Sequence, residues 1–265
     1  QWVNAARDCD AALIVAPENK GVLAQGVAVL RAAGVDVIAG SGDFLRVASD
    51  KWQTAKKLHA SGIAHPVSMT LSDRRSESAL SKHNEFVVKP RDGCASMDIT
   101  TFDSLEEATA ALTDEMILQA KMPGQPISVS LVATGTKQTF LPAVRQTISE
   151  DTFSYQGGCG PLNADAQRRA TTLASLAVSA MPPTVRGFVG IDVLLGATSE
   201  QDCIVEINPR LSTSYVGLRH MIDGNIAARL FDLETGPVSC SVAVESVRWT
   251  SSGQVWINDL AADRA

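Results

Sequence analysis

The chain has 265 residues, of which 45% are hydrophobic and 20% are charged, and its formal net charge is −6. This length predicts two compact units rather than one, and the negative charge excludes broad binding of nucleic acid, because no basic surplus is available to neutralise phosphates. The five cysteines have no metal-ligand spacing, which predicts reduced thiols and a cytoplasmic protein. No apolar run is long enough to span a bilayer, so we expect no membrane partner.

The first predicted elements are a strand over 11–17, a helix over 21–34 and a strand over 35–40. A strand, a helix and a second strand in close succession form a βαβ unit, which starts a parallel sheet. One such unit makes a small sheet, and the sequence begins without an initiator Met. We therefore interpret residues 1–48 as part of a Rossmann-like domain whose first residues are missing.

The remaining predicted elements alternate between helices and strands, which predicts an α/β fold. The helices are expected over 50–60, 104–115 and 164–181, and the strands over 85–90, 116–124, 127–135, 187–195 and 203–210. Ser104 and Glu107 have capping-box spacing at the start of the second helix. Residues 244–259 are predicted to form a strand, a turn and a strand.

The sequence EINPR at 206–210 places polar residues at every second position of a strand. Glu206, Asn208 and Arg210 then share one face, while Val205 and Ile207 point toward the core. Arg210 has the planar fork that binds phosphate or carboxylate with two hydrogen bonds.

The preceding strand contributes a second carboxylate to this face. A tight hairpin centred on Ser199, in the loop 196–202, places Asp192 opposite Glu206. Asp192, Glu206 and Asn208 would supply hard oxygen ligands that suit Mg²⁺ together with substrate phosphates. The alternative is that both acids face solvent on an edge hairpin, and the apolar residues that flank them on both strands argue against it.

Two lysines stand where a cation could meet phosphate. Lys89 ends the strand 85–90 and precedes a loop of small residues whose amides could cover phosphate oxygens. Lys51 begins a helix, where the helix dipole disfavours a cation, so a nearby anion would explain it. For each of them the alternative is an ordinary surface lysine.

Six motifs occur in the order found in ATP-grasp enzymes. They are SDK at 49–51, VVKPRDGCAS at 87–96, ILQAKMPGQPISVSLV at 117–132, YQGG at 155–158, GIDVLL at 190–195 and EINPRLSTSYVGL at 206–218. The sequence resembles the ATP-grasp superfamily from residue 49 to about 235. The last motif is the most specific, and it resembles the tyramine–glutamate ligases of methanofuran biosynthesis and their bacterial relatives in tetrahydromethanopterin-linked one-carbon metabolism.

The resemblance implies an ATP-grasp fold, in which two α+β lobes clasp ATP. The small lobe would cover 49–118, the large lobe with the metal and catalytic site 119–265, and the partial Rossmann-like domain 1–48 would precede them. ATP would be held through its phosphates and its adenine by Lys51, Lys89, Gly93, Ser96, Gln119, Ala120 and Met122. Asp192, Glu206 and Asn208 would hold two Mg²⁺ ions, with Mn²⁺ as a substitute, and Arg210 would steady the transferred phosphoryl group.

The implied activity is that of an ATP-dependent carboxylate–amine ligase, which forms an amide through an acyl phosphate. Its substrates would be a small acid such as glutamate and an amine such as tyramine, and a homodimer is compatible with the sequence. Ser212, Thr213 and Tyr215 follow Arg210 and are expected to line the substrate pocket, where Tyr215 either stacks on an aromatic amine or only packs. Arg145, in the strand FLPAVRQTI, is expected to be catalytic by holding a second carboxylate.

Other classes of protein have weaker support. Gly40-Ser41-Gly42 lacks the third glycine of a dinucleotide-binding fingerprint, the chain contains no P-loop motif, and its four histidines have no zinc-ligand spacing. A non-catalytic ATP-binding module that senses nucleotide or scaffolds a partner remains the alternative. The presence of Asp192, Glu206 and Arg210 favours the enzyme.

Overall fold

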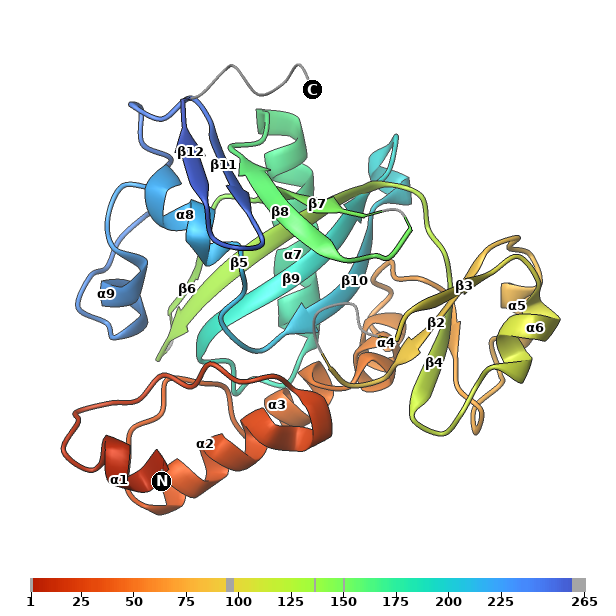
Figure 1. Ribbon diagram of the computed structural model, residues 1–265, viewed down its shortest axis with the longest axis horizontal. Helices are drawn as coiled ribbons and strands as arrows, with labels where there is room; N and C mark the ends of the chain where they lie inside the picture. The colour runs from red at the N-terminus through yellow and green to blue at the C-terminus, as the bar shows by residue number, and fades with distance from the viewer. Residues whose placement is uncertain (1, 94–97, 136, 150, 259–265) are drawn as a thin grey trace.

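The computed structural model describes residues 2–93, 98–135, 137–149 and 151–258. Figure 1 shows an N-terminal segment along one side, a small lobe around a four-stranded sheet and a large lobe around an eight-stranded sheet. Paired strands run antiparallel in both sheets. The predicted α/β class is confirmed. Within the described ranges, every helix is too short or too polar to cross a bilayer.

The N-terminal segment packs around α2. Its elements are α1 (Trp2–Ala6), the 3-10 turn η1 (Asn19–Gly21), α2 (Val22–Ala32) and α3 (Gly42–Ala48). Leu23, Val27 and Leu30 lie at helical spacing and fill a small core of their own. The strands expected over 11–17 and 35–40 form a single parallel bridge, between Ala12 and Val37, instead of a ladder. Two paired strands alone are marginal, which accounts for so short a pairing.

The small lobe contains the strand and loop that carry Lys89. Its sheet has the order β1-β4-β2-β3. The elements between residues 51 and 120 are α4 (Lys51–Ala60), β1 (Ser68–Met69), α5 (Glu77–Leu80), β2 (Phe86–Pro90), β3 (Thr100–Phe102), α6 (Leu105–Ala110) and β4 (Met116–Ala120). Ser104 caps α6 as predicted, by accepting from the N–H of Glu107 at 3.4 Å, but the helix ends before residue 115. Leu58 of α4 packs into the core of the large lobe, so α4 joins the two lobes.

The large lobe is a sheet of order β10-β9-β5-β7-β8-β11-β12, with β6 paired to β5. Its strands are β5 (Gln125–Thr134), β6 (Lys137–Phe140), β7 (Val144–Ile148), β8 (Tyr155–Gly160), β9 (Gly187–Leu195), β10 (Cys203–Asn208), β11 (Val247–Thr250) and β12 (Val255–Ile257). Its helical elements are α7 (Ala164–Ala180), η2 (Ser199–Gln201), α8 (Tyr215–Met221) and α9 (Ile226–Leu230). Strand β10 ends before Pro209, which has no N–H group to donate.

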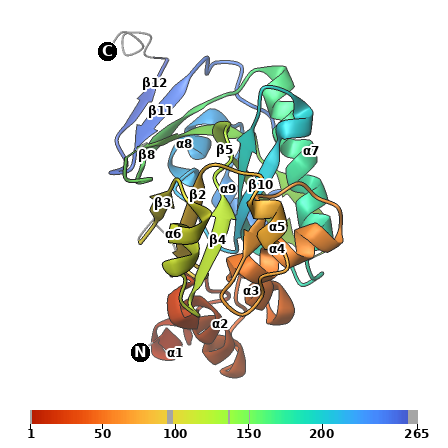
Figure 2. The same ribbon diagram turned by 90° about the vertical axis from the view of Figure 1, so that its right-hand side faces the viewer.

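Helices cover both faces of the large sheet. Figure 2 shows α7 on one side of it and α8 on the other. Ala170, Ala174 and Ala177 form one stripe of α7, and these small side chains bring the helix close to the sheet. Trp249 of β11 packs on the opposite side, where α8 carries Gly217. A Cβ at Gly217 would come within 2.1 Å of the Trp249 ring, so the glycine creates the space for it.

Candidate active site

The hairpin of β9 and β10 carries the two acids, and Glu206 lies directly opposite Asp192, as the sequence predicted. The ladder is not uniform, because the register shifts between Ile204 and Glu206 and makes Val205 a β-bulge. The bulge lets Ile204 and Ile207 both enter the core, whereas Val205 is only half-buried. The expectation that Val205 points into the core is therefore wrong, and Ile204 supplies that contact.

Both carboxylate oxygens of Asp192 accept hydrogen bonds from amide groups. Gln146 Nε2 of β7 donates to Oδ1 at 3.0 Å, and Asn208 Nδ2 donates to Oδ2 at 2.9 Å. Burial and then the charge of Glu206 raise the pKa of Asp192 to about 7, although the two hydrogen bonds oppose the change. Sequence reasoning missed Gln146. Gln146 comes close to Asp192 because β7 and β9 both pair with β5, and the sequence does not show this pairing.

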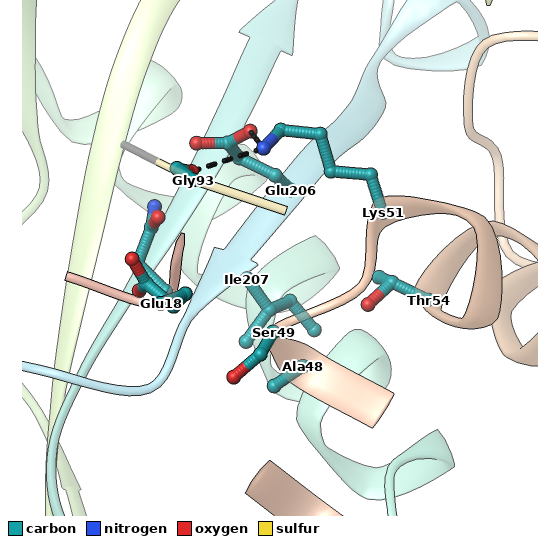
Figure 3. Close-up of a pocket in the computed structure, with 9 residues that line it drawn as sticks. Glu18, Ala48, Ser49, Lys51, Thr54, Gly93, Glu206 and Ile207 are labelled. Atoms are coloured by element: carbon teal, nitrogen blue, oxygen red, sulfur yellow. Dashed lines mark hydrogen bonds and ion pairs between the residues drawn. The ribbon is translucent and has the colours of Figure 1, made fainter. Parts of the chain in front are cut away.

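Two lysines approach Glu206 from the small-lobe side. The Nζ of Lys51 lies 3.5 Å from Glu206 Oε2 and donates to the Gly93 carbonyl oxygen at 3.1 Å (Figure 3). Lys89 is only 7% exposed, and burial lowers its pKa to about 8, although Glu206 opposes the change. Burial also disfavours the charged form of Glu206, but Lys51, Lys89 and Arg210 outweigh it and lower the pKa of Glu206. The predicted lysines and acids are thus brought together.

A small pocket opens beside this cluster. The pocket is lined by Lys51, Gly93, Glu206 and Asn208, and Glu18 forms its wall on the side of the N-terminal segment (Figure 3).

A set of hydrogen bonds that the sequence did not reveal holds Lys51 and the loop 91–93 in place. Asp50 caps α4 by accepting from the N–H of Trp52 at 2.8 Å, and its other oxygen pairs with Arg91 Nη2 at 2.5 Å. The N–H of Lys51 donates to the Arg91 carbonyl oxygen at 2.8 Å.

The predicted adenine-binding residues lie on β4 and just after it. Gln119 is buried, and its Nε2 donates to Ser68 Oγ at 2.9 Å, so the side-chain nitrogen is committed within the small lobe. Ala120 is part of the small-lobe core and its N–H donates to the Val67 carbonyl oxygen, so that N–H does not serve adenine. Met122 packs against the same core. Ser96 lies outside the described residues.

Lys89 and Gln119 share one face of the small sheet. Strand β2 pairs with β4 so that Lys89 lies opposite Ile117 and Val87 lies opposite Gln119. The alternate residues Val88 and Leu118 belong to the small-lobe core. Side chains of Lys89 and Gln119 therefore project from the other face, where Lys89 feels the charges of Glu206 and Asp192 on the large lobe.

The residues after Asn208 pack around the site. Ser212 lies over Gly190, where a Cβ would stand 3.3 Å from Ser212 Cβ. Thr213 is exposed, and the nearby Tyr155 hydroxyl accepts from Trp249 Nε1 at 2.8 Å. Tyr215 begins α8 and packs against the core that contains Trp249, which favours the packing alternative for Tyr215. Tyr155 is the aromatic residue near the acids that sequence reasoning did not select.

Arg145 does not join this cluster. It lies opposite Ile127 of β5, which in turn lies opposite Val193, so Arg145 projects on the face that α7 covers. Asp192 and Gln146 project on the other face. Nε and Nη2 of Arg145 lie 2.9 and 3.1 Å from the side-chain amide of Gln125, which accepts from both when its oxygen faces the arginine. The expectation that Arg145 holds a substrate carboxylate here is corrected: strand alternation places Gln146 on the site face instead.

The ATP-grasp domain family matches residues 48–214, which is more than half of the chain. The chain belongs to the ATP-grasp family. The match includes every predicted site residue except Tyr215. The N-terminal segment, with Glu18, precedes it.

Known ATP-grasp proteins resemble the chain in sequence and in fold. The tyramine–L-glutamate ligase of Methanocaldococcus fervens is 27% identical over 210 residues, which cover 79% of this chain and 62% of that protein. The chain therefore spans about three fifths of the length of this curated relative. An ATP-grasp superfamily protein from Archaeoglobus fulgidus superposes with a TM-score of 0.69 at 25% identity, over 92% of this chain and 71% of that one. N5-carboxyaminoimidazole synthetase from Staphylococcus aureus, in complex with ADP, shares the fold with a TM-score of 0.71 at 14% identity, over 89% and 65% of the two chains.

The donor set in this ATP-grasp chain fits a divalent cation. Asp192 and Glu206 face each other across two strands, and their mutual repulsion is part of what raises the pKa of Asp192. A bound cation removes such repulsion. The amide nitrogen of Asn208 is committed to Asp192, so only its oxygen is suited to ligate a metal. Two carboxylates and one amide oxygen are the ligands that Mg²⁺ prefers, with phosphate oxygens and waters completing the shell.

Proposed function

We propose that this chain is the catalytic part of an ATP-dependent carboxylate–amine ligase. The observation that carries the proposal is the cluster in which Asp192 lies opposite Glu206, while Lys51 Nζ lies 3.5 Å from Glu206 Oε2. Buried Lys89 adds a second cation from the small lobe. Cations from the small lobe and acids from the large lobe suit a nucleoside triphosphate that is bound with a metal ion between the two lobes.

In the proposed reaction, an oxygen of the substrate carboxylate attacks the γ-phosphorus of ATP, and ADP leaves. The amine nitrogen then attacks the acyl carbon, the bond to the phosphate oxygen breaks, inorganic phosphate departs and the nitrogen loses a proton. Lys51 and Lys89 would orient the phosphates, and Arg210 would stabilise charge on the transferred group. Asp192, Glu206 and Asn208 would hold Mg²⁺, which when bound neutralises phosphate charge. No covalent bond to the protein is required.

Glutamate and an aromatic amine such as tyramine are the proposed substrates. The support is the name of the M. fervens relative together with the motif EINPRLSTSYVGL.

The test is a screen for ADP release that crosses amino acids with amines, tyramine included. A ligase releases ADP only when both an acid and an amine are present, whereas a nucleotide sensor binds ATP without turnover. Asp192→Asn and Glu206→Gln should abolish release without unfolding the protein. Release in both variants at the wild-type rate would remove the metal assignment, and release with a pair other than glutamate and tyramine would change only the substrates.

A further inference from the structure

A loop of the N-terminal segment reaches the active site and contacts Arg210. Glu18 is only 4% exposed, although it lies in a loop. Arg210 Nε donates to Glu18 Oε2 at 3.0 Å and also lies 2.9 Å from Oε1, as an ion pair. A carboxylate this deeply buried is costly unless it is paired, so Arg210 and Glu18 hold each other in place.

The same loop also contacts the loop 91–93 of the small lobe. The N–H of Lys20 donates to Asp92 Oδ2 at 2.9 Å. A Cβ on Gly93 would come within 3.0 Å of the Asn19 amide, so Asn19 packs directly on the backbone that accepts from Lys51. Residues 18–20 therefore touch both lobes: Glu18 contacts the large lobe through Arg210, and Asn19 and Lys20 contact the small lobe.

This arrangement restrains the guanidinium before any ligand arrives. An arginine side chain has several rotatable bonds, and fixing it costs conformational entropy. The ion pair with Glu18 fixes the Arg210 side chain when the protein folds, so no further entropy is lost in fixing it during the reaction. Groups that are preorganised in this way lower the barrier. Glu18 also lines the pocket that contains Lys51 and Glu206, so the pair lies next to the proposed phosphoryl site.

We propose that Glu18 is a positioning residue that orients Arg210 toward the transferred phosphoryl group. The N-terminal segment is then part of the active centre, although it lies outside the stretch 48–214 that matches the family. The proposal rests on the proposed function, because it assigns Arg210 to phosphoryl transfer. It assigns ATP binding in the ground state to Lys51 and Lys89, independently of Glu18.

The test compares Glu18→Gln with Asp36→Asn. Asp36 is a matched control, because it also joins the N-terminal segment to the large lobe through an arginine, Arg186, at 2.5 and 2.8 Å, but at the surface. The readout is the affinity for ADP with aluminium fluoride, which mimics the transferring phosphoryl group, relative to the affinity for ATP. Glu18→Gln should weaken the first by about 10-fold to 100-fold, the size expected when a transition-state contact is misplaced, and leave ATP affinity unchanged. Asp36→Asn should change neither.

Glu18→Asp keeps the charge on a shorter side chain, and it should show an intermediate loss even if Glu18→Gln fails to fold. An unchanged ratio of affinities in a folded Glu18→Asp and Glu18→Gln overturns the proposal, as does an equal loss of ATP affinity, which would indicate general damage to the site. The ADP-release screen is separate. No release with any substrate pair, together with the expected ratio of affinities, contradicts the proposed ligase activity but keeps the contribution of Glu18 to binding of the phosphoryl mimic.

Discussion

Replacing Lys89 by methionine should stabilise the ligand-free protein and abolish its stabilisation by ATP. Lys89 is 7% exposed, and burial lowers its pKa from 10.5 to about 8, even with Glu206 nearby. Each pKa unit corresponds to about 1.4 kcal/mol, so keeping the ammonium charged in the folded state costs about 3 kcal/mol at pH 7. Methionine has a similar length and no charge, so Lys89→Met should raise the free energy of unfolding by an amount of that order.

The pH dependence identifies the cause. Between about pH 8 and pH 10.5 the unfolded chain still binds the Lys89 proton, whereas the folded chain has released it. Wild-type stability therefore rises with pH across this window relative to the variant, because stability rises wherever the unfolded state binds more protons. The advantage of Lys89→Met should be full below pH 8 and should vanish above pH 10.5.

The assay is urea unfolding at several pH values, followed by thermal unfolding with and without ATP and Mg²⁺. ATP at 100 times its Kd should stabilise the wild type by about 2.7 kcal/mol, and it should not stabilise Lys89→Met. Lys121→Met is the control, because Lys121 pairs with Glu85 at the surface of the same lobe, and losing such a pair costs less than about 1 kcal/mol. A Lys89→Met variant that is less stable than the wild type at pH 7 would refute the reasoning, since Glu206 would then stabilise the lysine more than burial destabilises it.

Three further substitutions test other parts of the site. Gln146→Ala removes one of the two amide donors to Asp192, and calorimetry should show Mg²⁺-dependent ATP binding weakened about 10-fold to 100-fold, as is typical when an outer-shell partner is lost. The exposed Gln156→Ala serves as its control, and an unchanged Mg²⁺ requirement in Gln146→Ala would separate Gln146 from the metal site. Arg145→Ala should leave the KM of the acid substrate unchanged in steady-state kinetics, because Arg145 projects on the α7 face; a raised KM would restore it as a carboxylate clamp. Gly158→Ala should lower stability by about 1–3 kcal/mol in urea unfolding, because its Cβ would lie 2.5 Å from the Trp249 ring and 2.7 Å from the Arg145 carbonyl oxygen; an unchanged midpoint would mean that β8 and β11 separate easily.

The elements that the sequence predicted well are those with a long, regular pattern. Strand β9 matches its expected range. Helix α7 begins where it was expected and ends one residue before the predicted end. The elements that it missed include short ones, such as β1 with two residues and α5 with four, and also α3 and α8, which have seven residues each. A few residues show no measurable periodicity, and their conformation depends on the neighbours that they pair with or pack against. The bulge at Val205 shows the same limit inside a correctly predicted strand.

The sequence by itself determined the acidic pair and its cations, because Asp192 and Glu206 lie on two strands joined by a short loop, where local geometry fixes which residues face each other. It also determined that Lys51 and Lys89 are available at element ends. Only the tertiary structure decided that Gln146, and not Arg145, reaches Asp192, since this depends on which strand lies beside β5. Glu18 and Arg210 meet across 192 residues of sequence. Contacts of this kind leave no local pattern, because they are produced by packing between units that fold around separate cores.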